Sequence, residues 1–197
     1  ARVFCVVRRY MTLADLKSGT QAALPDATFA LLRAEFGVTH ELFASPLNRS
    51  RHLDHFGSLF PDVDGFFGST GSFFDFELRA GSYEANPPFD RASCELAFAH
   101  AAAALARTNP LGARHALSVV FVVPTFAGFD PPRDVPGLAR FARALEELRP
   151  REHGFRMGLQ HQKTGAGGRD PGSRQARDVT CVHVPQNDAT ARRWRAT

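Results

Sequence analysis

One short stretch of the sequence combines residue types that could grip the amino group of a flat heterocycle: Asn86-Pro87-Pro88-Phe89. An adenine N6 amine is a poor nucleophile because its lone pair is spread into the ring, so a site that uses it must accept its hydrogen bonds. Asn86 offers a side-chain oxygen, and the prolines hold the backbone extended so that the Pro87 carbonyl can also accept. The Phe89 ring could stack on an extracted base, an interaction worth about 1–3 kcal/mol. The four residues form a candidate catalytic clamp.

The tetrapeptide alone is equally well explained as the start of a loop, because Asn-Pro and Pro-Pro dipeptides mark turns in many proteins. Its surroundings favour the clamp. Residues 82–85 have the pattern of a short strand after Gly81, and Asp90 opens an Ala-rich helical pattern. The clamp therefore follows the carboxyl end of a predicted strand, which is where α/β folds bind their ligands.

A second group of polar residues lies around another predicted strand end. Residues 38–44 have the pattern of a strand, and Pro46 must turn the chain away from it. The carboxylate of Glu41, the hydroxyl of Ser45 and the carboxamide of Asn48 could then hold the amino-acid end of S-adenosylmethionine, which needs acceptors for its ammonium and donors for its carboxylate. The alternative is an ordinary strand with a proline turn. No G-x-G-x-G loop is present.

Residues 60–71 continue with two carboxylates and an aromatic pair. Asp62 and Asp64 could receive the ribose hydroxyls of the cofactor, and Phe66 and Phe67 could flank its adenine. The alternative is that Asp-x-Asp-Gly is a turn and that the phenylalanine cluster at positions 66, 67, 73, 74 and 76 belongs to the core.

Composition predicts one globular, soluble and intracellular domain. The 197 residues suit a single domain, and 44% hydrophobic with 22% charged residues is close to the globular average. No apolar run approaches the ~18 residues of a membrane span, and no signal peptide is recognisable. The three cysteines are odd in number and far apart, so we expect reduced thiols. His52 and His55 lack a third ligand, so we expect no metal site.

Positive charge is concentrated at the end of the chain. Residues 149–197 carry ten Lys/Arg and four Asp/Glu, a balance of +6, whereas residues 1–148 carry fourteen and sixteen, a balance of −2. A basic segment beside a cleft suits a polyanion such as RNA. A solvated face or a flexible tail is an equally good explanation.

The remaining patterns predict an α/β fold in which strands alternate with helices. Helices are expected over residues 1–16, 26–36, 90–107 and 138–148. Residues 116–123 are almost continuously apolar, as in a strand buried on both faces of a parallel sheet, and a last strand is expected at 179–184. The proline-rich stretch 124–136 is a candidate substrate lip, and the glycine-rich stretch 163–174 is expected to be mobile.

These pieces, in this order, resemble the catalytic core of the phosphorylated-CTD-interacting factor family of cap-specific mRNA adenosine N6-methyltransferases. The resemblance covers about residues 23–194. Its most specific portions are Phe36-Gly37-Val38-Thr39-His40-Glu41, Phe43-Ala44-Ser45-Pro46-Leu47-Asn48, Phe60-Pro61-Asp62 onward to Gly71, and Glu84-Ala85-Asn86-Pro87-Pro88-Phe89, followed by Glu152-His153, Arg156, Gln160-His161 and Gln186-Asn187.

The resemblance implies a class I (Rossmann-like) S-adenosylmethionine-dependent methyltransferase, a three-layer α-β-α sandwich. It implies N6 methylation of the 2′-O-methyladenosine beside the cap of mRNA, in the nucleus, and contact with the phosphorylated RNA polymerase II tail through regions outside these residues. The catalytic residues would be Asn86, Pro87, Pro88 and Phe89. The cofactor would be held by Glu41, Phe43, Ala44, Ser45, Pro46, Asn48, Asp62, Asp64 and Glu84. RNA would be bound by Arg156, Gln160, His161 and Asn187.

Because the chain begins with Ala, we expect a fragment: a single core domain over residues 1–197, of which 1–22 end a preceding helical region. Two departures from the family pattern stand out. Pro124-Thr125-Phe126 replaces an acidic residue and a tryptophan, and residues 165–172 replace a segment richer in basic and aromatic residues. A shorter sequence pattern, Ala-Ser-Pro-x-Asn followed by Asn-Pro-Pro-aromatic, is similar to one in phage-type DNA adenine methyltransferases. The alternatives are therefore a DNA or internal-RNA adenine N6-methyltransferase, or an inactive core that binds nucleic acid or a partner.

Overall fold

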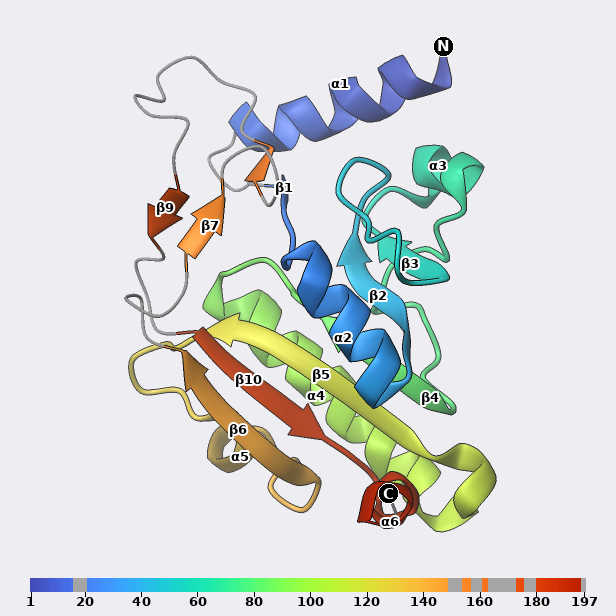
Figure 1. Ribbon diagram of the computed structural model, residues 1–197, viewed down its shortest axis with the longest axis vertical. Helices are drawn as coiled ribbons and strands as arrows, with labels where there is room; N and C mark the ends of the chain where they lie inside the picture. Colours follow the sequence, from blue (N-terminus) through green and yellow to red (C-terminus); the bar gives the residue numbers. More distant parts are fainter. Residues whose placement is uncertain (16–20, 149–153, 157–160, 163–172, 176–179, 196–197) are drawn as a thin grey trace.

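The computed structural model describes residues 1–15, 21–148, 154–156, 161–162, 173–175 and 180–195. Its centre is a six-stranded sheet of order β3-β2-β4-β5-β10-β6 (Figure 1). The strands are β2 (Val38–Ala44), β3 (His55–Ser58), β4 (Gly81–Ala85), β5 (Leu117–Pro124), β6 (Ala142–Leu148) and β10 (Thr180–Pro185). The first four run parallel, and β10 runs antiparallel to both β5 and β6.

The helices lie around this sheet. They are α1 (Arg2–Asp15), α2 (Asp26–Phe36), α3 (Pro61–Asp64), α4 (Arg91–Thr108), α5 (Pro131–Asp134) and α6 (Asp188–Arg195). Short 3-10 turns cover Gly65–Phe67, Asn109–Leu111 and Ala113–His115. Two small ladders pair β1 (Gln21–Ala22) with β8 (His161–Gln162) and β7 (Gly154–Arg156) with β9 (Ser173–Gln175). Among the described residues, no helix combines the length and apolar character needed to cross a bilayer.

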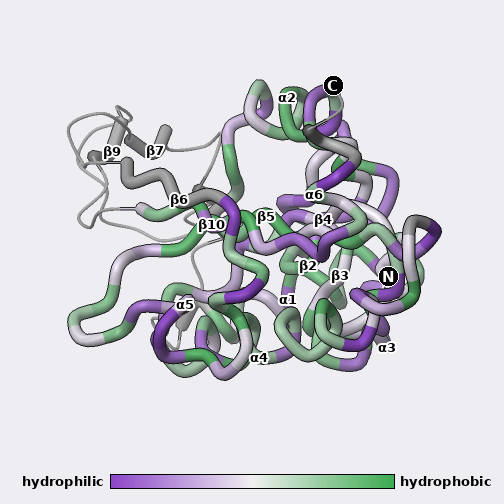
Figure 2. The backbone as a smooth tube through the Cα atoms, turned by 90° about the horizontal axis from the view of Figure 1, so that it is seen from below, coloured by the Kyte–Doolittle hydropathy of each residue, from purple (hydrophilic) through white to green (hydrophobic). Residues whose placement is uncertain are grey.

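Helices cover both faces of the sheet, because its central strand is apolar on both sides. Every residue of β5 is buried. Val119 and Phe121 pack in the larger cluster with α4, whereas Val120 packs with Phe29 and Leu32 of α2 on the other face. Figure 1 shows α2 and α4 on opposite sides of β5, and Figure 2 shows the hydrophobic character of β5 in the middle of the fold. The predicted α/β architecture is confirmed at this level.

The helix and strand that lead to the site begin and end where the sequence predicts. Residues 26–36 form α2, and Gly37 ends it in the left-handed region at φ 60°, with its N–H donated to the carbonyls of Arg33 and Leu32. The left-handed conformation favours glycine, which has no Cβ to clash there. The chain then enters β2 at once, with the predicted bounds.

The prediction of a helix over 138–148 is wrong, because residues 142–148 form the edge strand β6. Turns at Val135 and Leu138 lead into it, where the N–H of Leu138 and of Phe141 bind the carbonyls of Val135 and Leu138, respectively. The strand then pairs antiparallel with β10 from Ala142 to Leu148. The sequence of this stretch has high helix propensity, but strand β10 offers a row of backbone groups that need partners, and tertiary pairing outweighs a weak local preference.

Candidate functional site

The clamp Asn86-Pro87-Pro88-Phe89 directly follows β4, as the sequence predicts. The last residue of β4, Ala85, lies opposite Phe121 of β5 in the parallel ladder. The loop that leaves β2 lies at the same edge of the sheet, because Glu41 of β2 pairs with Glu84 of β4. The structure thus brings the clamp and the predicted cofactor stretch to the carboxyl ends of two neighbouring parallel strands, the position at which open α/β sheets bind ligands.

Helix α4 holds the second proline of the clamp. The carbonyl of Pro88 accepts the backbone N–H of Asp90 at 2.8 Å and lies 3.6 Å from the Cys94 thiol, which donates to it. Asp90 also caps α4, since its Oδ1 accepts the N–H of Ser93 at 2.8 Å. The Pro88 carbonyl is therefore occupied by the helix, and Pro87 supplies the remaining carbonyl of the Pro-Pro pair.

Asn86 contributes an unsatisfied acceptor. Its Oδ1 atom is buried and has no hydrogen-bond partner within the described part of the chain. Buried polar groups nearly always have a partner, and leaving one without costs about 1–3 kcal/mol, so an exception calls for a functional explanation. Pro87 is buried, whereas the Phe89 side chain is 45% exposed. A hydrogen-bond acceptor and an accessible ring thus lie three residues apart.

Glu41 and Glu84 form a buried carboxyl pair beside the clamp. The exposed fraction is 2% for Glu41 and 0% for Glu84. Glu41 Oε2 accepts the N–H of Ser50 at 2.7 Å, whereas neither oxygen of Glu84 has a partner among the described residues. Burial raises the pKa of Glu41 to about 7. Burial, followed by repulsion from Glu41, raises the pKa of Glu84 well above its ordinary value.

The loop after β2 is shaped by its own polar residues. Asn48 Oδ1 accepts the N–H of Ser45 at 2.8 Å and its hydroxyl at 2.9 Å, and the Ser45 hydroxyl in turn accepts the N–H of Leu47. Phe43 packs its ring 4.9 Å from that of Phe73. Ala44 and Pro46 are half-buried in this corner. The stretch is a closed turn whose side chains hold the backbone next to the Glu41–Glu84 pair.

Asp62 and Asp64 lie on α3 and bind α1. Tyr10 donates its hydroxyl to Asp64 Oδ2 at 2.6 Å, and Arg9 pairs with Asp62 at 3.0 Å. Asp64 is fully buried, and its Oδ1 has no partner in the described residues. Burial, then the bond to Asp64, raises the pKa of Tyr10. The ribose role of the two carboxylates stays a prediction.

Phe66 lies at the surface, and its place beside the cofactor adenine stays a prediction. Its side chain is 60% exposed, and the guanidinium of Arg2 lies 4.0 Å from the centre of its ring. Phe73 of the same phenylalanine cluster is a core residue at 2% exposed, whereas Phe74 is 43% exposed, so the core alternative holds for only part of the cluster.

Of the predicted RNA-binding residues, Asn187 has a structural place instead. It is fully buried, and its Oδ1 accepts the N–H of Leu117 and both the N–H and hydroxyl of Thr190. Its Nδ2 donates to the Thr108 hydroxyl and the His115 carbonyl. These bonds use its side chain fully, and Leu117 begins β5, at the sheet edge opposite the clamp. The structure therefore gives Asn187 a structural role in place of the predicted contact with RNA.

The other predicted RNA contacts lie in the last quarter of the chain. Arg156 lies on β7 and His161 on β8, while Gln160 lies outside the described residues, as does most of the glycine-rich stretch 163–174. Within the described ranges, no group of three His, Cys, Asp or Glu side chains is placed to hold a metal ion.

Two residues at the site are absent from the predictions, Tyr10 and Cys94. Cys94 follows the helix cap Asp90 by four residues, a spacing that turns its side chain back over the first helical turn. That spacing is a usable signal for Cys94. No local signal joins Tyr10 to Asp64, because 54 residues separate them.

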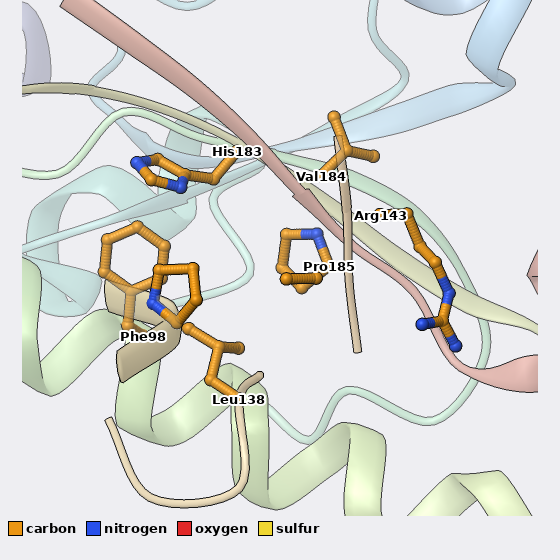
Figure 3. Close-up of a pocket in the computed structure, with 8 residues that line it drawn as sticks. Phe98, Leu138, Arg143, His183, Val184 and Pro185 are labelled. Atoms are coloured by element: carbon orange, nitrogen blue, oxygen red, sulfur yellow. The ribbon is translucent and has the colours of Figure 1, made fainter. Parts of the chain in front are cut away.

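Two hollows lie away from the Glu41–Glu84 pair. A pocket of about 220 Å³ lies between α4, β6 and β10, and Figure 3 shows Phe98 and His183 on one side of Pro185 and Arg143 on the other. The His183 ring meets Phe98 edge-on at 5.2 Å, and burial lowers its pKa. A wider groove of about 580 Å³ runs along the first turns of α4, with Arg91 and Phe129 in its lining.

Comparison with known proteins identifies the family. The profile described as "Phosphorylated CTD interacting factor 1 WW domain" matches residues 1–158. The chain belongs to the phosphorylated CTD interacting factor 1 family. The sequence-based family prediction is thereby confirmed.

Two curated relatives are similar to most of this family member. The human and mouse proteins named mRNA (2′-O-methyladenosine-N(6)-)-methyltransferase are 37% and 36% identical to it over 169 residues. The alignment covers 81% of this chain and 22% of each relative, so the chain spans about a fifth of the length of the curated relatives it matches.

Proposed function

We propose that this chain carries the catalytic site of an S-adenosylmethionine-dependent adenosine N6-methyltransferase built on a class I methyltransferase fold. The observation that carries the proposal is the buried Asn86 Oδ1, which has no partner in the described residues and lies at the carboxyl end of β4. A buried acceptor without a partner suits a substrate that supplies a hydrogen-bond donor. The amino group of adenine is such a donor.

Each residue of the clamp has a separate role in binding the base. Asn86 Oδ1 and the Pro87 carbonyl accept the two hydrogens of the amino group, which localises the nitrogen lone pair. Phe89, 45% exposed, stacks on the base. The acceptors stabilise the positive charge that develops on the nitrogen, and they are fixed before the reaction begins. The Pro88 carbonyl accepts the Asp90 N–H and the Cys94 thiol, which joins the clamp to the start of α4.

The residues at the end of β2 and β4 suit the cofactor. S-adenosylmethionine supplies an activated methyl group on a cationic sulfur, and it also carries an ammonium. The carboxyl groups of the buried Glu41–Glu84 pair complement these cations when they are ionised, and the closed turn containing Ser45 and Asn48 forms the adjoining wall. Phe43, Ala44 and Pro46 would complete the cofactor pocket, with Asp62 and Asp64 on the ribose side.

The substrate is proposed to be the 2′-O-methyladenosine next to the cap of mRNA, which is the nucleotide in the names of the human and mouse relatives. A nuclear location and a link to the phosphorylated RNA polymerase II tail belong to the same proposal and rest on the family. Arg156, Gln160 and His161 would then contact RNA from the basic last quarter of the chain.

Transfer of label from S-adenosylmethionine to matched oligonucleotides tests this function. Capped and uncapped RNAs that begin with 2′-O-methyladenosine are compared with single-stranded DNA. We expect labelling of the capped adenosine, its loss in Asn86→Ala, and a fall of at least tenfold in Phe89→Ala. Phe4→Ala removes an aromatic side chain that is 67% exposed on α1 and serves as the matched control. Equal labelling of DNA would favour the phage-type alternative, and cofactor binding without transfer would indicate an inactive core.

A further inference from the structure

The Glu41–Glu84 pair lies in the middle of an apolar row that crosses the sheet. In the parallel ladders, Phe56 pairs with Glu41, Glu41 with Glu84, and Glu84 with Val120. Directly paired residues of neighbouring strands project from the same face of a sheet. Phe56 is 1% and Val120 2% exposed. Two carboxyl groups are therefore adjacent to each other and flanked by hydrocarbon on both sides.

Few groups of opposite charge face this pair. The Ser50 N–H binds Glu41, and the Arg49 guanidinium, which lies 5.0 Å from the Phe56 ring centre, acts on Glu41 from the same loop. No partner contacts the oxygens of Glu84 in the described part of the chain.

Among the described residues, the elements packed against this face supply no second cation to the pair. Helix α2 presents Phe29 and Leu32 to this face, while its Asp26 and Arg33 pair with side chains of residues 51–54. His40, the neighbour of Glu41 on β2, binds Thr70 instead.

Two adjacent carboxylates in such a setting cannot both stay ionised without a counter-charge, because burial and mutual repulsion both favour a bound proton. The pair therefore takes up a proton when nothing cationic is bound. A ligand cation that replaces the proton restores the charge balance. The unpaired oxygens of Glu84 and the unpaired Oδ1 of Asn86, two residues later and just after β4, indicate where that ligand would lie.

Resting on the proposed function, we propose that the Glu41–Glu84 pair is the cation subsite of the cofactor pocket and exchanges a proton for the positive charge of S-adenosylmethionine. The O–H bond of one carboxylic acid breaks, its proton leaves to solvent, and the carboxylate so formed faces the cofactor cation. No oxidant or reductant takes part. The shared chemistry is a cationic group, and the cofactor has two, the ammonium and the sulfonium.

Calorimetric titration at pH 7 in two buffers with different ionisation enthalpies counts the protons released on binding. We expect release approaching one proton with S-adenosylmethionine and none with 5′-methylthioadenosine, which has neither cation. S-adenosylhomocysteine keeps the ammonium but has a neutral sulfur. Release with this product assigns the subsite to the ammonium, and its absence assigns the subsite to the sulfonium.

The pH dependence and two variants complete the test. The Kd of the wild-type protein for S-adenosylmethionine should fall by up to tenfold per pH unit between pH 5 and 7. Glu84→Gln keeps the shape of the side chain but has no proton of its own to lose, so proton release should fall and Kd should rise at least tenfold. Glu35→Gln, at an exposed position of α2, should behave as wild type.

Failure of the inference differs from failure of the proposed function. Binding of S-adenosylmethionine by the wild type with the same observed heat in both buffers would overturn the inference and leave the function standing. Absence of any cofactor binding would overturn both. The wild-type buffer comparison needs no variant, so it decides the question even if Glu84→Gln folds poorly.

Discussion

The thiol of Cys94 lies 3.6 Å from the carbonyl oxygen of Pro88 and donates to it, so the first turn of α4 binds the backbone of the clamp. The same carbonyl also accepts the Asp90 N–H. The clamp and the helix are thus one unit, and changes at the start of α4 should affect the clamp.

Replacing the cap of α4 should loosen this unit. Asp90→Ala removes the acceptor for the Ser93 N–H and should cost about 1 kcal/mol of stability. Denaturant unfolding measures the loss, and methyl transfer should fall with it. Asp130→Ala is the matched control, because Asp130 precedes α5 without making a side-chain cap bond. An equal loss of stability in both variants would contradict the prediction.

The three cysteines should differ sharply in reactivity. Cys5 is exposed, whereas Cys94 and Cys181 are buried. Burial, followed by the nearby charges of Asp90 and Glu95, raises the pKa of the Cys94 thiol to about 12, so little thiolate exists at neutral pH. Iodoacetamide labelling followed by mass spectrometry should modify Cys5 first and the other two only in denaturant. Early labelling of Cys94 would show that α4 opens more readily than its packing indicates.

The buried hydrogen bond between Tyr10 and Asp64 should contribute more to the free energy of unfolding than the exposed ion pair between Arg9 and Asp62. Tyr10→Phe leaves a fully buried carboxylate with one partner fewer and should cost about 1–3 kcal/mol. Arg9→Ala breaks an exposed pair with Asp62 and should cost less than about 1 kcal/mol. Both values come from denaturant unfolding. Similar costs for the two variants would mean that the buried bond is replaced by water.

The stability of the ligand-free protein should fall as pH rises through the range of the Glu41–Glu84 pair. The pKa of Glu41 is raised from 4.5 to about 7, so between these values the folded state holds more protons than the unfolded state. Stability therefore decreases with pH in that window, by up to about 3 kcal/mol at 1.36 kcal/mol per unit. Glu41→Gln should flatten the curve, since Gln can still accept the Ser50 N–H. Exposed Glu35→Gln should leave it unchanged.

The sequence predicts the elements with strong local signals and misses those decided by distant partners. Helix α2 has an apolar face and a terminal glycine, and β5 is apolar throughout, so both are found at the predicted positions. Residues 142–148 look helical, but β10, about 40 residues later, makes them a strand.

The same contrast holds for the candidate site. The position of the clamp after a strand follows from its own residues. The adjacency of Glu41 and Glu84 depends on the register between β2 and β4, which the sequence does not display. The structural role of Asn187 depends on bonds to residues 70 to 79 positions earlier, which the sequence does not display. Composition and motif alone therefore favour a contact with RNA, which the structure does not support.

The docking of α1 onto α3 has a consequence for the order in which the chain folds. The two bonds that join them, from Arg9 and Tyr10, close loops of 53 and 54 residues. Closing such loops costs entropy that contacts within the parallel sheet must first offset. We expect α1 to attach late, after β2 and β3 have paired, and to detach before the sheet melts. Amide hydrogen exchange should then be faster in α1 than in the central strands, which remain protected. Exchange in α1 would thus show whether the first third of the fold is complete.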